Sequence, residues 1–145
     1  MQIRVCNFTM VSIKVRRKGN ISDDVITRDK EIVVLYKDMR RSFAYSGLYQ
    51  ICKAISGTIM SRHYISYETA KIIYKKYQNT GMYPDGDGYR RKLYRSFIRS
   101  CEREMERNPL ISEEDMIWRA LYSKADCCGI SPNRIYRVLK KGGYR

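Results

Sequence analysis

Residues 121–141 read LYSKADCCGISPNRIYRVLKK, and this stretch carries the clearest local signals in the chain. Apolar residues recur at helical spacing in its second half: Ile135, Val138 and Leu139. That spacing predicts a helix with one buried face. Ser131 can cap this helix, and Pro132 suits its first position, where a missing N–H costs nothing. Gly129 can adopt the left-handed conformation that ends a preceding helix, so we expect two helices joined by a tight turn.

The pattern resembles the two-helix core of helix-turn-helix DNA-binding proteins of the small type that phages and mobile elements encode. The resemblance covers residues 121–141 and depends on Ala125, the triplet 129–131, Ile135 and Val138. It implies that small Ala125 lets the two helices approach and that the second helix enters the major groove of DNA. Lys124 departs from the pattern, because that position of the first helix is usually apolar.

The side chains left over on the second helix are polar or cationic, and Asn and Arg can make bidentate contacts to base edges. The resemblance implies base contacts for Pro132, Asn133, Arg134 and Arg137. It implies mostly phosphate contacts for Tyr136, Lys140 and Lys141.

The composition also favours a polyanionic partner. The 145 residues include 29 Lys and Arg but only 15 Asp and Glu, which gives a net charge of +14. Hydrophobic residues make up 43% of the chain, which is enough to form a core. Nucleic acid fits this charge best, with an anionic membrane surface as the competitor. No stretch is long and apolar enough to span a membrane, and the N-terminus lacks a signal-peptide layout. We expect a cytoplasmic or nucleoid protein, or a virion component, without membrane partners.

A weaker echo of the C-terminal pattern occurs at residues 65–76. The two stretches, ISYETAKIIYKK and ISPNRIYRVLKK, share an opening Ile-Ser, an apolar pair and a closing Lys-Lys. The chain is therefore expected to hold either two related binding units or a structural pseudo-repeat. If the first copy binds DNA, its candidate contacts are Tyr67, Lys71 and Lys75.

Elsewhere the patterns predict a mainly α protein made of small helical bundle units. Helices are expected from Ser22 to about Arg41, over Leu48 to about Met60, after Ser66, over 89–107 and from Glu113. The turn sequence GMYPDGDG at 81–88 separates two units, 21–80 and 89–145. Val11, Ile13 and Val15 alternate with polar side chains before a basic run, so residues 1–20 are expected to form a short β-hairpin or a basic arm.

The segment 89–107 is amphipathic with a basic start. Its candidate phosphate contacts are Arg90, Arg91, Lys92 and Arg95. The competing interpretation is a merely solvated face, because acidic residues at 102, 104 and 106 partly neutralise the second half of the segment.

No enzyme or metal site can be assembled from the sequence. The five cysteines are odd in number and irregularly spaced, which indicates reduced thiols, and a lone His63 leaves no zinc ligand set. Asp85 and Asp87 lack the later carboxylates of a calcium loop. We expect a protein without catalytic residues, cofactor or small-molecule substrate, in which His63 is structural or lies at the surface.

Two functions remain open at this stage. One is a double-stranded DNA-binding protein with sequence readout, acting as a transcriptional regulator or accessory factor, either alone or as a homodimer. The other is a basic structural protein of a virion or ribonucleoprotein particle that holds nucleic acid without reading its sequence. The 13 tyrosines keep single-stranded DNA or RNA open as a ligand, because aromatic rings stack on unpaired bases.

Overall fold

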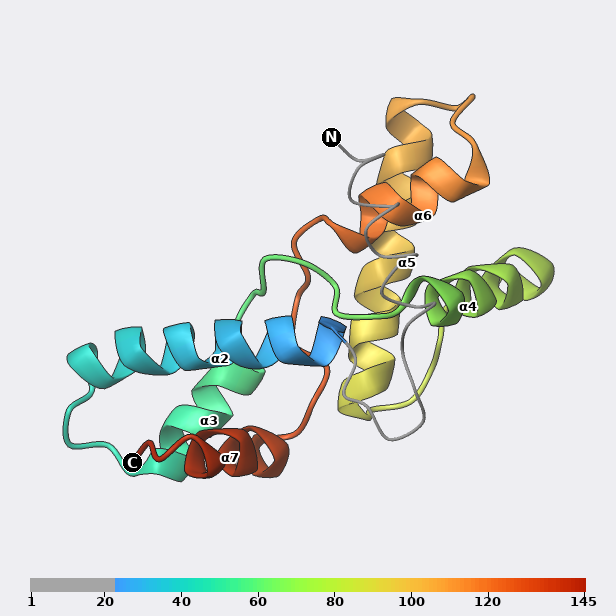
Figure 1. Cartoon of the computed structure of the whole chain (residues 1–145). Helices are drawn as coiled ribbons and strands as arrows, with labels where there is room; N and C mark the ends of the chain where they lie inside the picture. Colours follow the sequence, from blue (N-terminus) through green and yellow to red (C-terminus); the bar gives the residue numbers. More distant parts are fainter. Residues whose placement is uncertain (1–22) are drawn as a thin grey trace.

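The computed structural model describes residues 23–145, which form six α-helices (Figure 1). In chain order these are α2 (Asp23–Ser42), α3 (Leu48–Ser56), α4 (Tyr67–Thr80), α5 (Tyr89–Arg107), α6 (Glu113–Leu121) and α7 (Pro132–Lys141). Residues 23–145 contain no β-strand, so the predicted mainly α class is confirmed. The hairpin or arm predicted for residues 1–20, and Ser22, lie outside the described residues.

Three helices begin at a serine whose side chain satisfies a free backbone N–H group. Ser66 caps α4, Ser112 caps α6 and Ser131 caps α7. In each case the donor is the N–H three residues further on, at 3.1–3.3 Å, from Thr69, Asp115 and Arg134. The helix starts predicted from these serines are therefore confirmed, because capping depends only on local sequence.

One predicted helix is too long. The sequence predicts helix as far as about Met60, whereas α3 ends at Ser56. The N–H of Gly57 bonds to the carbonyl of Ala54 at 3.3 Å, which tightens and closes the last turn. Met60 then pairs with Ala125, 65 residues further along, and no local pattern contains a contact of that kind.

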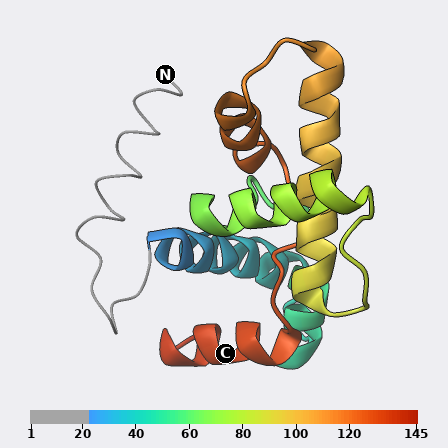
Figure 2. The ribbon, with the colours of Figure 1, turned by 90° about the vertical axis from the view of Figure 1, so that its right-hand side faces the viewer.

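The helices pack in two groups of three around one continuous core (Figures 1 and 2). One group consists of α2, α3 and α7, and the other consists of α4, α5 and α6. The turn at 81–88 does not separate the two groups, because α7 packs on α3 and α4 packs on α5 and α6. Each group therefore takes its third helix from the other half of the chain.

Both halves follow one pattern with an offset of 65 residues. Leu48–Ser56 and Glu113–Leu121 are both nine-residue helices, and Leu48 and Glu113 lie 65 residues apart. The capping serines of α4 and α7 have the same offset, and α2 moved by 65 residues covers 88–107, against 89–107 for α5. The echo between 65–76 and 130–141 is thus one part of a repeat of three helices.

The two halves meet at an antiparallel bridge between equivalent residues. Met60 and Ala125 are both fully buried, and each N–H donates to the carbonyl of the other, at 2.9 and 3.0 Å. A reciprocal pair of bonds between equivalent residues is what a two-fold arrangement of the halves produces. The residue after each bridge residue is also held in an equivalent way. The N–H of Ser61 donates to the carboxylate of Glu31, and the N–H of Asp126 donates to the hydroxyl of Ser96, in each case 30 residues earlier.

The first helix of the predicted helix-turn-helix does not form. Residues 122–131 connect α6 to α7 without a helix, and α7 packs on α3, the counterpart of α6. Gly129 has the predicted positive φ, 81°, but it ends no helix. Instead it lets the chain pass close to α5, where a Cβ on Gly129 would lie 2.5 Å from Cδ2 of Leu93. A helix through this segment would give up that approach and the Met60–Ala125 bridge.

His63 joins the halves from a fully buried position. Its Nε2 lies 2.8 Å from the hydroxyl of Ser96 on α5. Burial lowers the pKa of His63 from 6.5 to about 4, because the buried imidazole loses the hydration that stabilises its charged form. His63 is therefore a neutral structural residue near pH 7.

Acid is expected to destabilise the protein through His63. Between pH 6.5 and about 4, the unfolded chain binds a proton at His63 that the folded chain does not bind. The free energy of unfolding should therefore fall by roughly 3 kcal/mol as the pH drops across this window. Below it, both states bind the proton, so His63 causes no further loss of stability. Urea titrations give the free energy of unfolding of the parent protein and of His63→Gln at each pH. Subtracting the two removes the contribution of the carboxylates, because these titrate in both proteins. A parent-minus-variant difference that does not change with pH would contradict the prediction.

Candidate nucleic-acid interface

Helix α7 combines a buried stripe with a cationic outer side. Ile135 and Leu139 are fully buried where α7 packs on α3. The exposed side chains match the sequence prediction: Asn133, Arg134, Tyr136, Arg137, Lys140 and Lys141. The helix contains no acidic residue, and within residues 23–145 none of its four cations forms an ion pair. Their positive charge is therefore directed at solvent.

Pro132 does not belong to this outer side. The resemblance to helix-turn-helix proteins implies that it faces bases, but it is buried in the structure. As the first residue of α7 it follows directly on the buried segment that passes α5. Pro132 therefore starts the helix and contributes to the core, and the prediction of a base contact is wrong for this residue.

The first turn of α5 carries three exposed cations: Arg90, Arg91 and Lys92. Neither α5 nor α7 has an acidic residue in its first turn, and α3 has none either, whereas α2, α4 and α6 each have one or more. Cations at a helix N-terminus oppose the helix dipole by about 0.3–1 kcal/mol each. The first turn of α5 thus gives up some helix stability, and its free N–H groups and cations together form a surface that attracts anions.

The N-terminal ends of α5 and α7 lie at the same end of the molecule (Figures 1 and 2). Gly129, three residues before α7, packs against Leu93 in the second turn of α5. The structure therefore brings the starts of two cation-rich helices to one end of the molecule. We use the name basic face for the first-turn cations of α5 together with the exposed polar and cationic residues of α7: Arg90, Arg91, Lys92, Asn133, Arg134, Tyr136, Arg137, Lys140 and Lys141.

Arg95 has a structural role in place of the predicted phosphate contact. Its Nη1 donates to the carbonyls of Pro84 and Gly86, each at 2.8 Å. These bonds hold the 81–88 turn against α5. The guanidinium is therefore occupied by the protein, which local sequence could not show because the acceptors are backbone atoms of a turn.

A hollow of about 540 Å³ lies beside the basic face, between α5, the end of α3 and the segment 122–131. Lys92, Arg95 and Arg99 line it from one side of α5. Arg99 was not among the predicted residues, although its helical spacing from Lys92 could have indicated it. Its guanidinium lies 2.6 Å from the carboxylate of Asp126, so that its charge is largely balanced. Since Lys92 already belongs to the basic face and Arg95 and Arg99 have protein partners, the hollow adds no further unpartnered cation to that face.

The candidate residues of α4 are not part of the basic face. Tyr67 stacks on Trp118, with ring centroids 4.9 Å apart and planes 18° apart, and Nζ of Lys75 lies 2.9 Å from the carboxylate of Glu113. Lys71 is exposed. Figure 2 shows α2 between α4 and α7, so the two counterpart helices present separate surfaces.

Two features are absent from the part of the chain that the structure describes, a metal-ligand group and a membrane-spanning helix. No group of three or more His, Cys, Asp or Glu residues there could hold a metal ion. Its four cysteines, Cys52, Cys101, Cys127 and Cys128, are buried free thiols, and no helix of residues 23–145 is long and apolar enough to cross a membrane. Comparisons of the chain with protein-family models, curated proteins and solved structures found no match.

Proposed function

We propose that this chain binds double-stranded DNA through the basic face. The observation that carries the proposal is the outer side of α7, which has four cations and no acid and lies at the same end of the molecule as the acid-free first turn of α5. Each phosphate that such cations neutralise releases condensed counterions, and this release provides affinity that does not depend on sequence. The net charge of +14 adds long-range attraction.

In this proposal α7 enters the major groove, which is wide enough for one α-helix. Asn133, Arg134 and Arg137 have the side chains that make bidentate contacts to base edges. Tyr136, Lys140 and Lys141 contact phosphate, and the first turn of α5 contacts the backbone of the duplex. With base readout, the protein acts in the cytoplasm or nucleoid as a transcriptional regulator or as an accessory factor of a phage or mobile element.

One observation favours a second candidate, a structural protein that holds nucleic acid without reading its sequence. Residues 122–131 contain no helix, so α7 is not preceded in the chain by the helix that orients the reading helix in helix-turn-helix proteins, and it packs on α3 instead. A cationic surface without that geometry still binds phosphates. The two candidates differ in what loss of the arginines of α7 changes. A sequence-reading protein loses its preference for particular DNA sequences, whereas a structural protein loses only overall affinity for nucleic acid.

Replacing Arg134 and Arg137 together by Ala is expected to weaken duplex binding and to lower its salt dependence. If both contact phosphate, the slope of log K against log salt should decrease by about 2, and if they contact bases, preference should drop by about 1–3 kcal/mol per lost contact. Selection from random duplexes at two salt concentrations, followed by titration of parent and variant, measures both quantities. A selected motif that the variant no longer prefers supports sequence readout, whereas uniform weakening supports the structural role.

Arg107→Ala is the matched control. Arg107 is an exposed arginine at the end of α5 opposite to the basic face (Figure 1), and it pairs with Glu104 at 2.8 Å. Its removal changes the net charge by the same amount as either single α7 variant and should leave the motif and almost all of the affinity intact. Duplex binding that is absent in the parent, or that Arg107→Ala weakens as much as Arg134→Ala, would overturn the proposal.

A further inference from the structure

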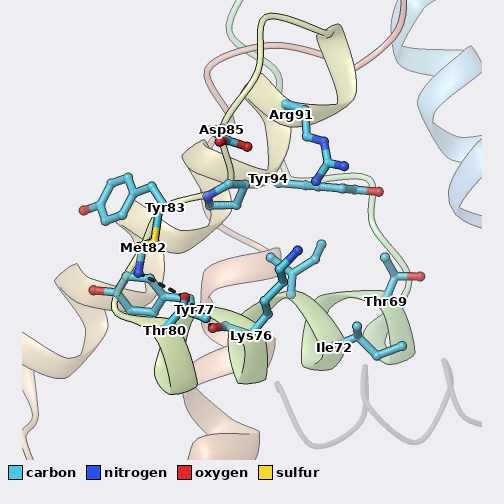
Figure 3. Close-up of a pocket in the computed structure, with 12 residues that line it drawn as sticks. Thr69, Ile72, Lys76, Tyr77, Thr80, Met82, Tyr83, Asp85, Arg91 and Tyr94 are labelled. Atoms are coloured by element: carbon cyan, nitrogen blue, oxygen red, sulfur yellow. Dashed lines mark hydrogen bonds between the residues drawn. The ribbon is translucent and has the colours of Figure 1, made fainter.

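A second surface, beside α4, has a different character. A cleft of about 440 Å³ lies between α4, the loop 82–85 and the start of α5 (Figure 3). This volume is in the range of about 300–1,000 Å³ that is typical of small-ligand sites. We call it the α4 cleft, and the lining residues that matter below are Ile72, Lys76, Met82, Tyr83, Arg91 and Tyr94.

The walls of the α4 cleft are apolar and partly open to water. Ile72 is 69% exposed and Met82 is 66% exposed, although both are large apolar side chains. Apolar residues that gather around a hollow typically mark a binding surface. The aromatic wall is held in place from behind, because the hydroxyls of Tyr77 and Tyr83 both donate to the carboxylate of Glu102. The cleft is therefore formed before any ligand enters.

Two cations without ion pairs accompany this aromatic surface. Figure 3 shows the ring of Tyr94 edge-on, with Arg91 above it and Lys76 reaching up from α4 below it. Within residues 23–145 neither Lys76 nor Arg91 forms an ion pair, and Asp85 is the one acidic residue in the lining. The ring of Tyr94 thus lies between two cations without ion pairs, and the guanidinium of Arg90 also lies over it, 6.0 Å from the centroid. An aromatic ring with cations around it matches a planar ring that carries a phosphate.

The repeat indicates that this surface has diverged from its counterpart. With the 65-residue offset, Ile72 corresponds to Arg137 of the basic face and Lys76 corresponds to Lys141. The outer side of α4 thus keeps the lysine and replaces an arginine with an exposed apolar residue. That change weakens contact with a duplex backbone and favours contact with the flat face of a base, which is accessible only when the base is unpaired.

We propose that the α4 cleft binds a nucleotide, with its base stacked on Tyr94 and its phosphate on Lys76 and Arg91. The ligand is either a free nucleotide or one unpaired nucleotide of a single strand, since both present the same base and phosphate. This second site goes beyond duplex binding and does not depend on α7. Arg91 belongs to both surfaces, so the α4 cleft adjoins the basic face.

The test uses the full chain with methyl-labelled methionine, and its probes are adenosine monophosphate, a short oligothymidylate and a random duplex. Binding in the cleft should shift the NMR signal of the Met82 methyl group, which Met82→Leu identifies by its disappearance. Tyr94→Leu should weaken binding of the oligothymidylate by about 5- to 150-fold, the usual range for loss of one base–aromatic stack. Lys76→Gln, at an exposed position where folding is not at stake, should also weaken it. Lys71→Gln removes the same charge from α4 outside the cleft and is the control.

Each outcome of this test has a defined meaning. A Met82 shift with both probes supports the proposal and identifies a free nucleotide as sufficient, whereas a shift with the oligothymidylate alone supports a single-stranded ligand. No shift with either probe, or equal losses in Lys76→Gln and Lys71→Gln, overturns the proposal and leaves the cleft as a surface for a protein. Duplex binding is read separately: Tyr94→Leu should preserve it, and Arg134→Ala should reduce it without affecting the Met82 shift.

Discussion

Fragments 1–84 and 85–145 are expected to be unfolded when they are separate and to fold when they are mixed. The reason is that each half of the chain packs its last helix into the other half: α4 packs on α5 and α6, and α7 packs on α2 and α3. Fragment 1–84 contains α2 and α3 without α7, and fragment 85–145 contains α5 and α6 without α4. Neither fragment contains all three helices of either group observed in the structure.

The contact between α3 and α7 illustrates the size of the effect. Ile51 and Ile55 on α3, and Ile135 and Leu139 on α7, are at most 2% exposed in the whole chain. Each loses roughly 1.5–3 kcal/mol of burial energy when it is returned to water. Four such residues account for much of the about 5–15 kcal/mol by which small domains are stable. The counterpart contact between α4 and α6 is lost at the same time.

Circular dichroism and urea unfolding of each fragment and of an equimolar mixture measure the result. The mixture should recover helix and a cooperative transition whose midpoint rises with concentration, because folding is then bimolecular. The control is the full chain with a protease site in the 85–88 turn, which should stay folded after cleavage. A cooperative transition in either fragment alone would contradict the exchange and would support the division into units 21–80 and 89–145 that the turn sequence suggests.

Gly129→Ala is expected to lower the free energy of unfolding by about 3 kcal/mol. Part of the loss comes from a φ of 81°, which costs a residue with a Cβ about 1–2 kcal/mol. The rest is steric, because the new Cβ would lie 2.5 Å from Cδ2 and 3.0 Å from Cβ of Leu93. Leu93 is fully buried, so it cannot move aside without disturbing the core.

Two further variants separate the two causes. Gly81 has a similar φ of 68°, and a Cβ added there would meet no atom within 4 Å, so that Gly81→Ala should show only the backbone loss of about 1 kcal/mol. Leu93→Ala removes Cδ2, the atom nearest to the new Cβ, and Cγ, so its combination with Gly129→Ala should be less destabilising than the sum of the single variants. Urea unfolding of the parent, the two single variants and the double variant gives this double-mutant cycle. Additive losses would show that Leu93 is not the obstacle.

Much of the outer side of α7 could be predicted because it depends on residues three or four apart. Capping by Ser131 and burial of Ile135 and Leu139 follow from that spacing, and the exposed cations are what remains. The role of Arg95 could not be predicted in this way, because its partners are carbonyls of a turn that folds back on α5. Lys75 is similar, since its partner Glu113 lies 38 residues away in sequence.

The α4 cleft was not predicted, although its residues come from neighbouring parts of the sequence. Ile72 and Tyr77 fit an ordinary amphipathic helix, and the 81–88 turn looks like a solvated linker. These residues line a cleft because the turn lies against α5. The turn is held there by the bonds from Arg95 to its carbonyls and by the bonds from Tyr77 and Tyr83 to Glu102. These are long-range contacts, and periodicity contains no information about them.

Local sequence therefore accounts for where the helices begin, which sides of them are buried and where positive charge gathers. These properties depend on interactions within a few residues, such as caps, helical spacing and turn chemistry. The choice of partner for each helix depends instead on competing tertiary contacts. In a repeated chain, α3 and α6 offer similar apolar faces to α7. Long-range contacts direct α7 to α3: the bridge between Met60 and Ala125, the approach of Gly129 to Leu93, and the bonds from Tyr36 and Arg40 of α2 to the carbonyl of Arg145.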